Sequence, residues 1–146
     1  MKYLIKQPLR YAVLLMALLA SACSMQIISD FDQVSFNKMM QVSSRIDGFY
    51  LRLMYLPKEE RTYTQSDSQY IDIEVELNAL RRMQQYRPMN ELTLKQVDIA
   101  IDLWLQDKKA HQEKDTVSDF IIKRHREQFT QVFDAMITGE LSKPIN

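Results

Sequence analysis

Between residues 39 and 56, apolar side chains recur at alternating intervals of three and four residues. No other feature constrains the fold of this chain as strongly. The positions are Met39, Val42, Ile46, Phe49, Leu53 and Leu56. Such a repeat places one apolar stripe along an α-helix, which is typical of a helix packed in a bundle. Ser29 or Asp30 can cap the start of this helix, and Pro57 ends it because proline disfavours helical backbone in the residue before it.

The next segment carries two competing periodicities. Residues 71–77 alternate apolar and acidic side chains, which is the pattern of a half-buried strand. The same segment also fits a helix, with an apolar face made by Tyr70, Ile73, Leu77 and Leu80. No second alternating run exists to pair with a strand, and acidic residues precede basic ones, as suits a helix dipole. The pattern therefore favours a helix ending before Pro88, and a strand over residues 71–77 remains the alternative.

Two more helices follow, each with a capping pattern at its start. Thr93 with Gln96, and Thr116 with Asp119, have the three-residue spacing of a capping box. The third helix has an apolar seam at Leu94, Val97, Ile101 and Trp104. The fourth has a stripe at Ile122, His125, Phe129, Val132 and Met136. Gly139 suits the C-cap of this last helix.

Polar composition predicts the connections between the helices. Residues 57–68 are expected to form the longest loop, and residues 110–115 a polar turn. The tail from Glu140 is expected to be frayed. Gly48 lies inside the first helix, where we expect close backbone packing against a neighbour. Four amphipathic helices with mostly short connections predict an all-α, antiparallel up-down-up-down four-helix bundle over residues 31–140, with residues 141–146 as a flexible tail.

The N-terminal segment has the three parts of a secretory signal. Its basic region holds Lys2, Lys6 and Arg10 with no acidic residue nearby. The apolar run that follows covers residues 11–22 and is too short for a bilayer-spanning helix, which needs roughly 20 residues. The run ends in small residues, namely Ala20, Ser21 and Ala22.

The sequence Leu19-Ala20-Ser21-Ala22-Cys23 resembles the lipobox of bacterial lipoproteins. The resemblance implies that residues 1–22 are a signal peptide, that cleavage falls between Ala22 and Cys23, and that Cys23 carries a diacylglycerol and an amide-linked acyl chain such as palmitate. Residues 23–30 then form a lipidated tether. In Gram-negative lipoproteins the residue after the cysteine influences sorting. Ser24 there implies a lipid-anchored protein on the periplasmic side of the outer membrane, with retention in the inner membrane as the alternative.

Removal of residues 1–22 leaves 124 residues with a net charge of −3. That length suits a single domain with its own core. A weakly acidic domain with no basic cluster is a poor binder of nucleic acid. Because Cys23 is the only cysteine, acylation leaves no thiol for a disulfide.

No catalytic, cofactor-binding or metal-binding motif is present in the sequence. The Glu-x-x-His pairs of bundle metal sites, H-E-x-x-H, glycine-rich phosphate loops and G-x-S-x-G are all absent. Asp98 and Asp102 lie four residues apart, but we expect them to form a solvated acidic face. His125 is the one ambiguous residue. It falls on the apolar stripe of the last helix, where we expect a core histidine with a hydrogen-bonding partner, or alternatively a pH-sensitive residue.

These observations leave three hypotheses of function. The first is a non-enzymatic interaction or assembly factor of the cell envelope, bound to the bilayer through acylated Cys23 and to an unidentified envelope protein. The second is a chaperone similar in architecture to the secretion-system pilotins, some of which are lipid-anchored helical bundles that bind an amphipathic helix of a secretin subunit. An open apolar groove between two helices would favour it. The third is an enzyme, which a polar cleft around His125 with two carboxylates would favour.

Overall fold

The computed structural model describes residues 28–145, and this part of the chain contains four long helices and one short helical turn, with no strand. The long helices are α2 (Gln33–Tyr55), α3 (Tyr63–Gln85), α4 (Glu91–Lys114) and α5 (Asp119–Leu141), and the 3-10 turn η1 is Lys58–Glu60. The predicted all-α class is confirmed. The signal peptide, the cleavage site at Ala22 and the lipidation site at Cys23 lie outside the described residues.

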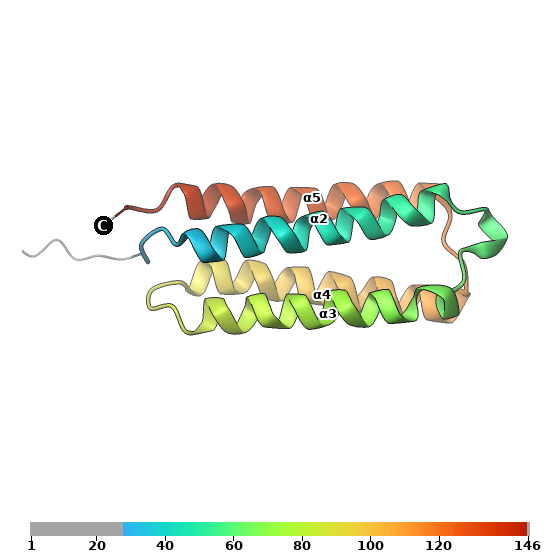
Figure 1. The fold of residues 1–146 in the computed structure, drawn as a ribbon, viewed down its shortest axis with the longest axis horizontal. Coiled ribbons are helices and arrows are strands. Elements are labelled where there is room, and N and C mark those ends of the chain that lie inside the picture. The colour runs from blue at the N-terminus through green and yellow to red at the C-terminus, as the bar shows by residue number, and fades with distance from the viewer. Residues whose placement is uncertain (1–27, 146) are drawn as a thin grey trace, which may run out of the picture.

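The four helices form an antiparallel bundle in which each helix lies beside its neighbours in sequence (Figure 1). The pairs α2/α5 and α3/α4 pack most extensively, the α2/α3 and α4/α5 seams are looser, and the diagonal pairs scarcely touch. Residues 28–32, the α3–α4 turn and residues 142–145 share one end, here called the terminal end (Figure 1). Residues 56–62 and 115–118 form the opposite, distal end. The predicted four-helix bundle is therefore confirmed.

Aromatic side chains from all four helices meet around Trp104, which is fully buried. Its indole Nε1 donates a hydrogen bond of 3.1 Å to the carbonyl oxygen of Tyr70. The ring centroids of Phe49, Tyr70 and Phe129 lie 5.2, 4.9 and 5.9 Å from that of Trp104. Such aromatic pairs add about 0.5–1.5 kcal/mol each beyond the burial of their area. This cluster holds the middle of the bundle together.

The structure corrects the predicted start of three helices. Asp32 caps α2, since its Oδ2 accepts hydrogen bonds from the backbone N of Ser35 at 2.9 Å and from the Ser35 hydroxyl at 2.6 Å. The α4 helix begins after Asn90 rather than at Thr93, and the capping residue of α5 is Ser118 rather than Thr116. Ser118 Oγ accepts from the backbone N of Ile121 at 3.4 Å.

The loop predicted for residues 57–68 is shorter than expected, because α3 already begins at Tyr63. The backbone N of Tyr63 donates to Asp115 Oδ1 at 2.8 Å, so a side chain from the facing loop caps α3. Residues 71–77 are helical, which settles the strand alternative. Ile73 and Leu77 are buried, whereas Ile71 and Val75 are exposed.

Three further expectations are wrong, two about helix ends and one about packing. Most of the turn predicted for residues 110–115 is the last part of α4, which ends at Lys114 and is followed by the C-cap Asp115 with a left-handed φ of 49°. Gly139 is not a C-cap, because α5 continues to Leu141 and no glycine of the described chain has a positive φ. Gly48 does not mark close packing, since a Cβ there would meet nothing within 4 Å.

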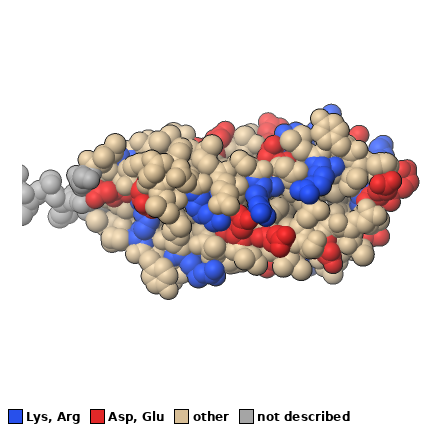
Figure 2. Space-filling view, viewed as in Figure 1, with Lys and Arg blue, Asp and Glu red and all other residues tan. Residues whose placement is uncertain are grey.

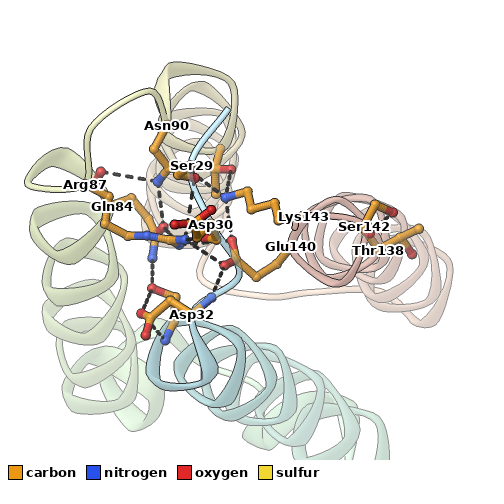
Figure 3. A network of polar contacts seen from close by, with 12 residues as sticks. Ser29, Asp30, Asp32, Gln84, Arg87, Asn90, Thr138, Glu140, Ser142 and Lys143 are labelled. Carbon is orange, nitrogen blue, oxygen red and sulfur yellow. Dashed lines mark hydrogen bonds and ion pairs between the residues drawn. The ribbon is translucent and has the colours of Figure 1, made fainter. Parts of the chain in front are cut away.

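The C-terminal residues belong to a buried polar network at the terminal end, here called the terminal clamp and drawn in Figure 3. Its central residues are Ser29, Asp32, Arg87, Asn90, Glu140 and Lys143. The fully buried Glu140 carboxylate accepts from Arg87 at 2.8 and 3.0 Å, from Lys143 Nζ at 2.6 Å and from the backbone N of Asp32 at 2.9 Å. The fraying expected from Glu140 onward is therefore not found at Glu140 or Lys143.

The terminal clamp also fixes the first described residues. The backbone N of Ser29 donates to the Met89 carbonyl at 3.0 Å, and that of Phe31 donates to the Pro144 carbonyl at 2.8 Å. The Ser29 hydroxyl donates to Asn90 Oδ1 at 3.1 Å. The chain is thus attached to the bundle from Ser29 onward.

Candidate functional site

The seam between α4 and α5 is the loosest contact among neighbouring helices. It contains two hollows. The distal hollow has a volume of about 500 Å³ and is lined mainly by the second half of α4, the α4–α5 loop and the first turns of α5. The middle hollow, of about 290 Å³, is lined by Gln96, Ile99, Gln128, Gln131, Val132 and Ala135. Together the residues lining these hollows are called the α4–α5 groove.

Local sequence explains why this seam stays open. Ala110 and Ala135 offer only a methyl group where α4 and α5 face each other, and Thr116 and Ser118 are the small residues of the connecting loop. Small side chains at facing positions leave unfilled volume unless a large neighbour reaches into it. The larger apolar residues on the seam, such as Ile121, form its walls instead.

The floor of the distal hollow contains His125, the residue that sequence reasoning singled out. His125 is 8% exposed, and its Nδ1 lies 2.7 Å from Asp107 Oδ2, a contact that becomes an ion pair when the imidazole is protonated. The Tyr50 hydroxyl donates to the same oxygen at 2.6 Å. Burial, and then the negative charge of Asp107, raise the pKa of Tyr50, so this hydroxyl stays protonated and remains a donor. His125 thus has a carboxylate partner, as expected for a core histidine.

His111 lines the same hollow and was missed in the sequence, where it fell in the predicted turn. Its Nε2 lies 3.0 Å from the carbonyl oxygen of Arg61, and its Nδ1 lies 3.1 Å from the Tyr70 hydroxyl. A carbonyl only accepts, so Nε2 carries the hydrogen and Nδ1 of the neutral ring accepts from Tyr70. Burial lowers the pKa of His111 and raises that of Tyr70, which agrees with a neutral imidazole bonded to a protonated phenol.

Arg61 connects the α2–α3 loop to the α4–α5 loop at the distal end. It is only 4% exposed, and its guanidinium donates to the carbonyl oxygens of Met54, Leu56 and Val117 at 3.2, 3.0 and 3.3 Å. It also pairs with Asp119, whose pKa is lowered by this hydrogen bond. Arg61 was missed because a charged residue in a polar loop carries no sequence signal of burial. His111 did carry one, since it lies seven residues after Trp104 on the buried face of α4.

The buried polar groups in the hollow all have hydrogen-bond partners. Within residues 28–145, no buried side-chain nitrogen or oxygen lacks a hydrogen-bond partner, and no cluster of three or more metal-ligating side chains is found. Asp107 is the only carboxylate among the residues lining the distal hollow, whereas the enzyme hypothesis called for two. Asp98, which was expected on a solvated acidic face, accepts from Arg81 Nε at 2.6 Å. The hollow therefore offers a satisfied polar floor between apolar walls.

Two basic side chains lie at the distal hollow. Lys114 and Arg124 line the distal hollow, are exposed, and form no ion pair within 4 Å in the described chain. Elsewhere the surface charges are mixed, and the face seen in Figure 2 shows acidic and basic side chains next to one another. Lys38 and Arg45, for example, both contact Glu76 across the α2/α3 seam, at 3.4 and 3.0 Å. The apolar walls and the two basic side chains of the distal hollow fit a segment that carries both apolar and acidic side chains.

Comparison with known proteins gives no relative from which a function could be transferred. No protein-family model matches the chain. No curated protein and no solved structure is significantly similar to it. Among the helices of residues 28–145, none combines the length and the apolar character needed to cross a bilayer.

Proposed function

We propose that this protein is a lipoprotein of the outer membrane, held on the periplasmic side by acylated Cys23, and that it acts as a non-enzymatic interaction or assembly factor. The lipobox-like sequence before Cys23 supports the anchor. Only five residues, 24–28, separate Cys23 from Ser29, where the chain joins the bundle. The α4–α5 groove is the observation that carries the interaction role.

The partner that suits this groove is an amphipathic helix of an envelope protein. A helix added to a seam between two helices buries its apolar face on the groove walls and keeps its polar face in water. Ile99, which is 51% exposed, and the walls of the distal hollow supply the apolar contacts. Lys114 and Arg124 would pair with acidic residues on the partner. This mode of binding is similar to that of the lipid-anchored pilotins, a similarity of architecture alone.

Site-specific photocrosslinking in living cells tests the groove as the binding site. A photoreactive amino acid would replace Ile99 in the groove and, as a matched control, Ile71 on α3. The two residues are equally exposed, at 51% and 52%, and Ile71 lines neither hollow of the groove. We expect a discrete crosslinked product from position 99 and none from position 71. Equal yields at the two positions, or no product from position 99, would argue against the groove.

The anchor is tested separately by the fate of Cys23. Mass spectrometry of the mature protein should give an acylated N-terminal cysteine, and density-gradient separation of envelopes should place the protein in the outer-membrane fraction. The Cys23→Ala variant should keep its uncleaved signal peptide and lose acylation. A mature N-terminus at another residue, or a free Cys23 thiol in protein from wild-type membranes, would contradict the anchor.

A further inference from the structure

Exposed apolar side chains gather at the terminal end of the bundle. Seven large hydrophobic residues there are more than a third exposed, against two, Tyr55 and Phe120, at the distal end. The seven are Ile28, Val34, Tyr86, Met89, Leu92, Leu141 and Ile145. They come from the first turns of α2 and α4, the ends of α3 and α5, and the adjoining segments, so all four helices contribute (Figure 1). These seven residues are called the apolar rim.

The charged groups of this end are largely turned inward, into the terminal clamp. The side chains of Glu140, Lys143 and Arg87 are 0%, 8% and 14% exposed, and they pair with one another. Figure 3 shows these groups converging between the helices rather than projecting outward. The charged side chains that stay exposed near this end are Arg82, Glu91 and Lys95. The terminal end therefore presents apolar residues with few competing charges.

The turn between α3 and α4 holds one rim residue in an unusual backbone conformation. Met89 has a φ of 54°, in the left-handed region that side chains other than glycine rarely adopt. Its carbonyl oxygen accepts the hydrogen bond from the backbone N of Ser29. Such strain persists only where the surroundings enforce it. Here the contact with Ser29 fixes a methionine at the surface where the N-terminal segment joins the bundle.

We propose that the apolar rim rests in the interfacial layer of the bilayer that holds the lipid anchor. This inference rests on the proposed acylation of Cys23. The six residue steps from Cys23 to Ser29 span at most about 20 Å, so an acylated Cys23 would keep Ser29 within that distance of the lipid and the terminal end as the nearest part of the bundle. Leucine and methionine insert into the acyl boundary, and tyrosine is enriched at membrane interfaces. The occupant of the rim is thus lipid headgroups and upper acyl chains, and the bundle stands upright on the membrane.

Spin labelling of the acylated full-length protein tests this orientation. Since acylation blocks Cys23, the only native cysteine, a cysteine introduced at Leu92 would be the sole free thiol. Tyr55→Cys at the distal end is the matched control, because Leu92 and Tyr55 are 73% and 85% exposed. Each labelled protein is reconstituted into vesicles of phosphatidylethanolamine and phosphatidylglycerol. Collision rates of the nitroxide with oxygen and with a water-soluble nickel complex are then measured.

We expect the label at position 92 to collide several-fold less with the nickel complex than the label at position 55, and to remain accessible to oxygen. Replacing Tyr86 and Leu141 by aspartate in the Leu92→Cys background should restore nickel access while the protein stays bound to the vesicles.

Equal nickel access at positions 92 and 55 on vesicle-bound protein would overturn the orientation and leave the anchor intact. Labelling of the wild-type protein at Cys23, with loss of vesicle binding, would instead show that the anchor itself is wrong. If the label at position 92 is shielded from the nickel complex in native envelopes but not in lipid vesicles, the rim binds a protein partner, and the proposal is overturned.

Discussion

Glu140 is a carboxylate with no exposed surface, and it stays ionised because of its neighbours. Burial alone would raise the pKa of this carboxyl group, but hydrogen bonds from Arg87, Lys143 and the backbone N of Asp32 outweigh burial and hold the pKa below 4.5. A lowered folded-state pKa stabilises the fold above the unfolded-state pKa. That stabilisation is lost as the pH falls from about 4.5 through the folded-state value.

Replacing Glu140 by glutamine should therefore destabilise the protein strongly. The variant leaves Arg87 and Lys143 partly buried with no carboxylate, and removing one partner of a buried ion pair costs about 3–5 kcal/mol. Urea unfolding at neutral pH measures the loss. Glu127→Gln, on the exposed surface of the same helix, is the control and should change the free energy of unfolding by less than about 0.5 kcal/mol. Similar losses for the two variants would show that the clamp does not stabilise the fold.

His111 should make stability depend on pH in mildly acidic solution. Its pKa in the folded state is lowered from 6.5 by burial, so the unfolded chain takes up a proton at a pH where the folded chain does not. The free energy of unfolding should then fall as the pH drops below about 6.5, by at most about 1.4 kcal/mol per pH unit for this one proton. His111→Gln keeps a donor and an acceptor and should flatten the decline measured by urea unfolding between pH 7 and 5. An unchanged slope would contradict the assignment of a neutral His111.

At the scale of helices, apolar periodicity was sufficient to predict where each element lies. The seam from Met39 to Leu53 is buried as expected, and Ile73 and Leu77 face the core. Helix ends were predicted less well because their caps come from distant parts of the chain. Tyr63 is capped by Asp115, 52 residues away, and no local pattern signals such a contact. Glu140, which follows Gly139 in α5, likewise bonds Arg87 and the backbone N of Asp32, 53 and 108 residues away.

Replacing glycine by alanine at two positions inside helices should stabilise the protein. Gly48 in α2 and Gly139 in α5 have no positive φ, and a Cβ at either position would meet nothing within 4 Å. Without a steric or conformational need for glycine, Gly48→Ala and Gly139→Ala should each raise the free energy of unfolding by about 0.5–1 kcal/mol. Thermal unfolding followed by circular dichroism checks both variants. A lowered midpoint would mean that the helix needs the freedom of glycine at that position.

For the whole molecule, the bundle was predictable and the groove was not. Four amphipathic stretches with short connections define the antiparallel arrangement, but the width of a seam depends on how side chains from two helices fill the space between them. Ala110 and Ala135 do not mark an opening by themselves. His125 could be singled out because a polar residue broke an apolar stripe, whereas its partner Asp107 looked like any surface aspartate.

Removal of the last five residues should weaken the bundle as a whole. A chain ending at Leu141 loses Lys143, which bonds Glu140 and Asn90 at 2.6 Å each, and Pro144, whose carbonyl accepts from Phe31. We expect a loss of about 1–3 kcal/mol, since Glu140 would keep Arg87 but lose its second cation. Urea unfolding of the truncated protein measures this loss, with removal of Asn146 alone as the control. Full stability after truncation would show that the tail adds nothing to the terminal clamp.

Both ends of the described chain lie at the terminal end (Figure 1), and the length of the helices sets the distance from there to the distal end. A helix of 23 residues is about 35 Å long, and the α4 residues that line the distal hollow begin at Gln106, about 22 Å along the helix from Glu91. If the bundle stands on a membrane by its terminal end, its helices hold the distal hollow at a fixed distance from the bilayer surface. Only a partner segment that lies at this distance from the bilayer could enter the distal hollow, so its position as well as its chemistry would determine binding.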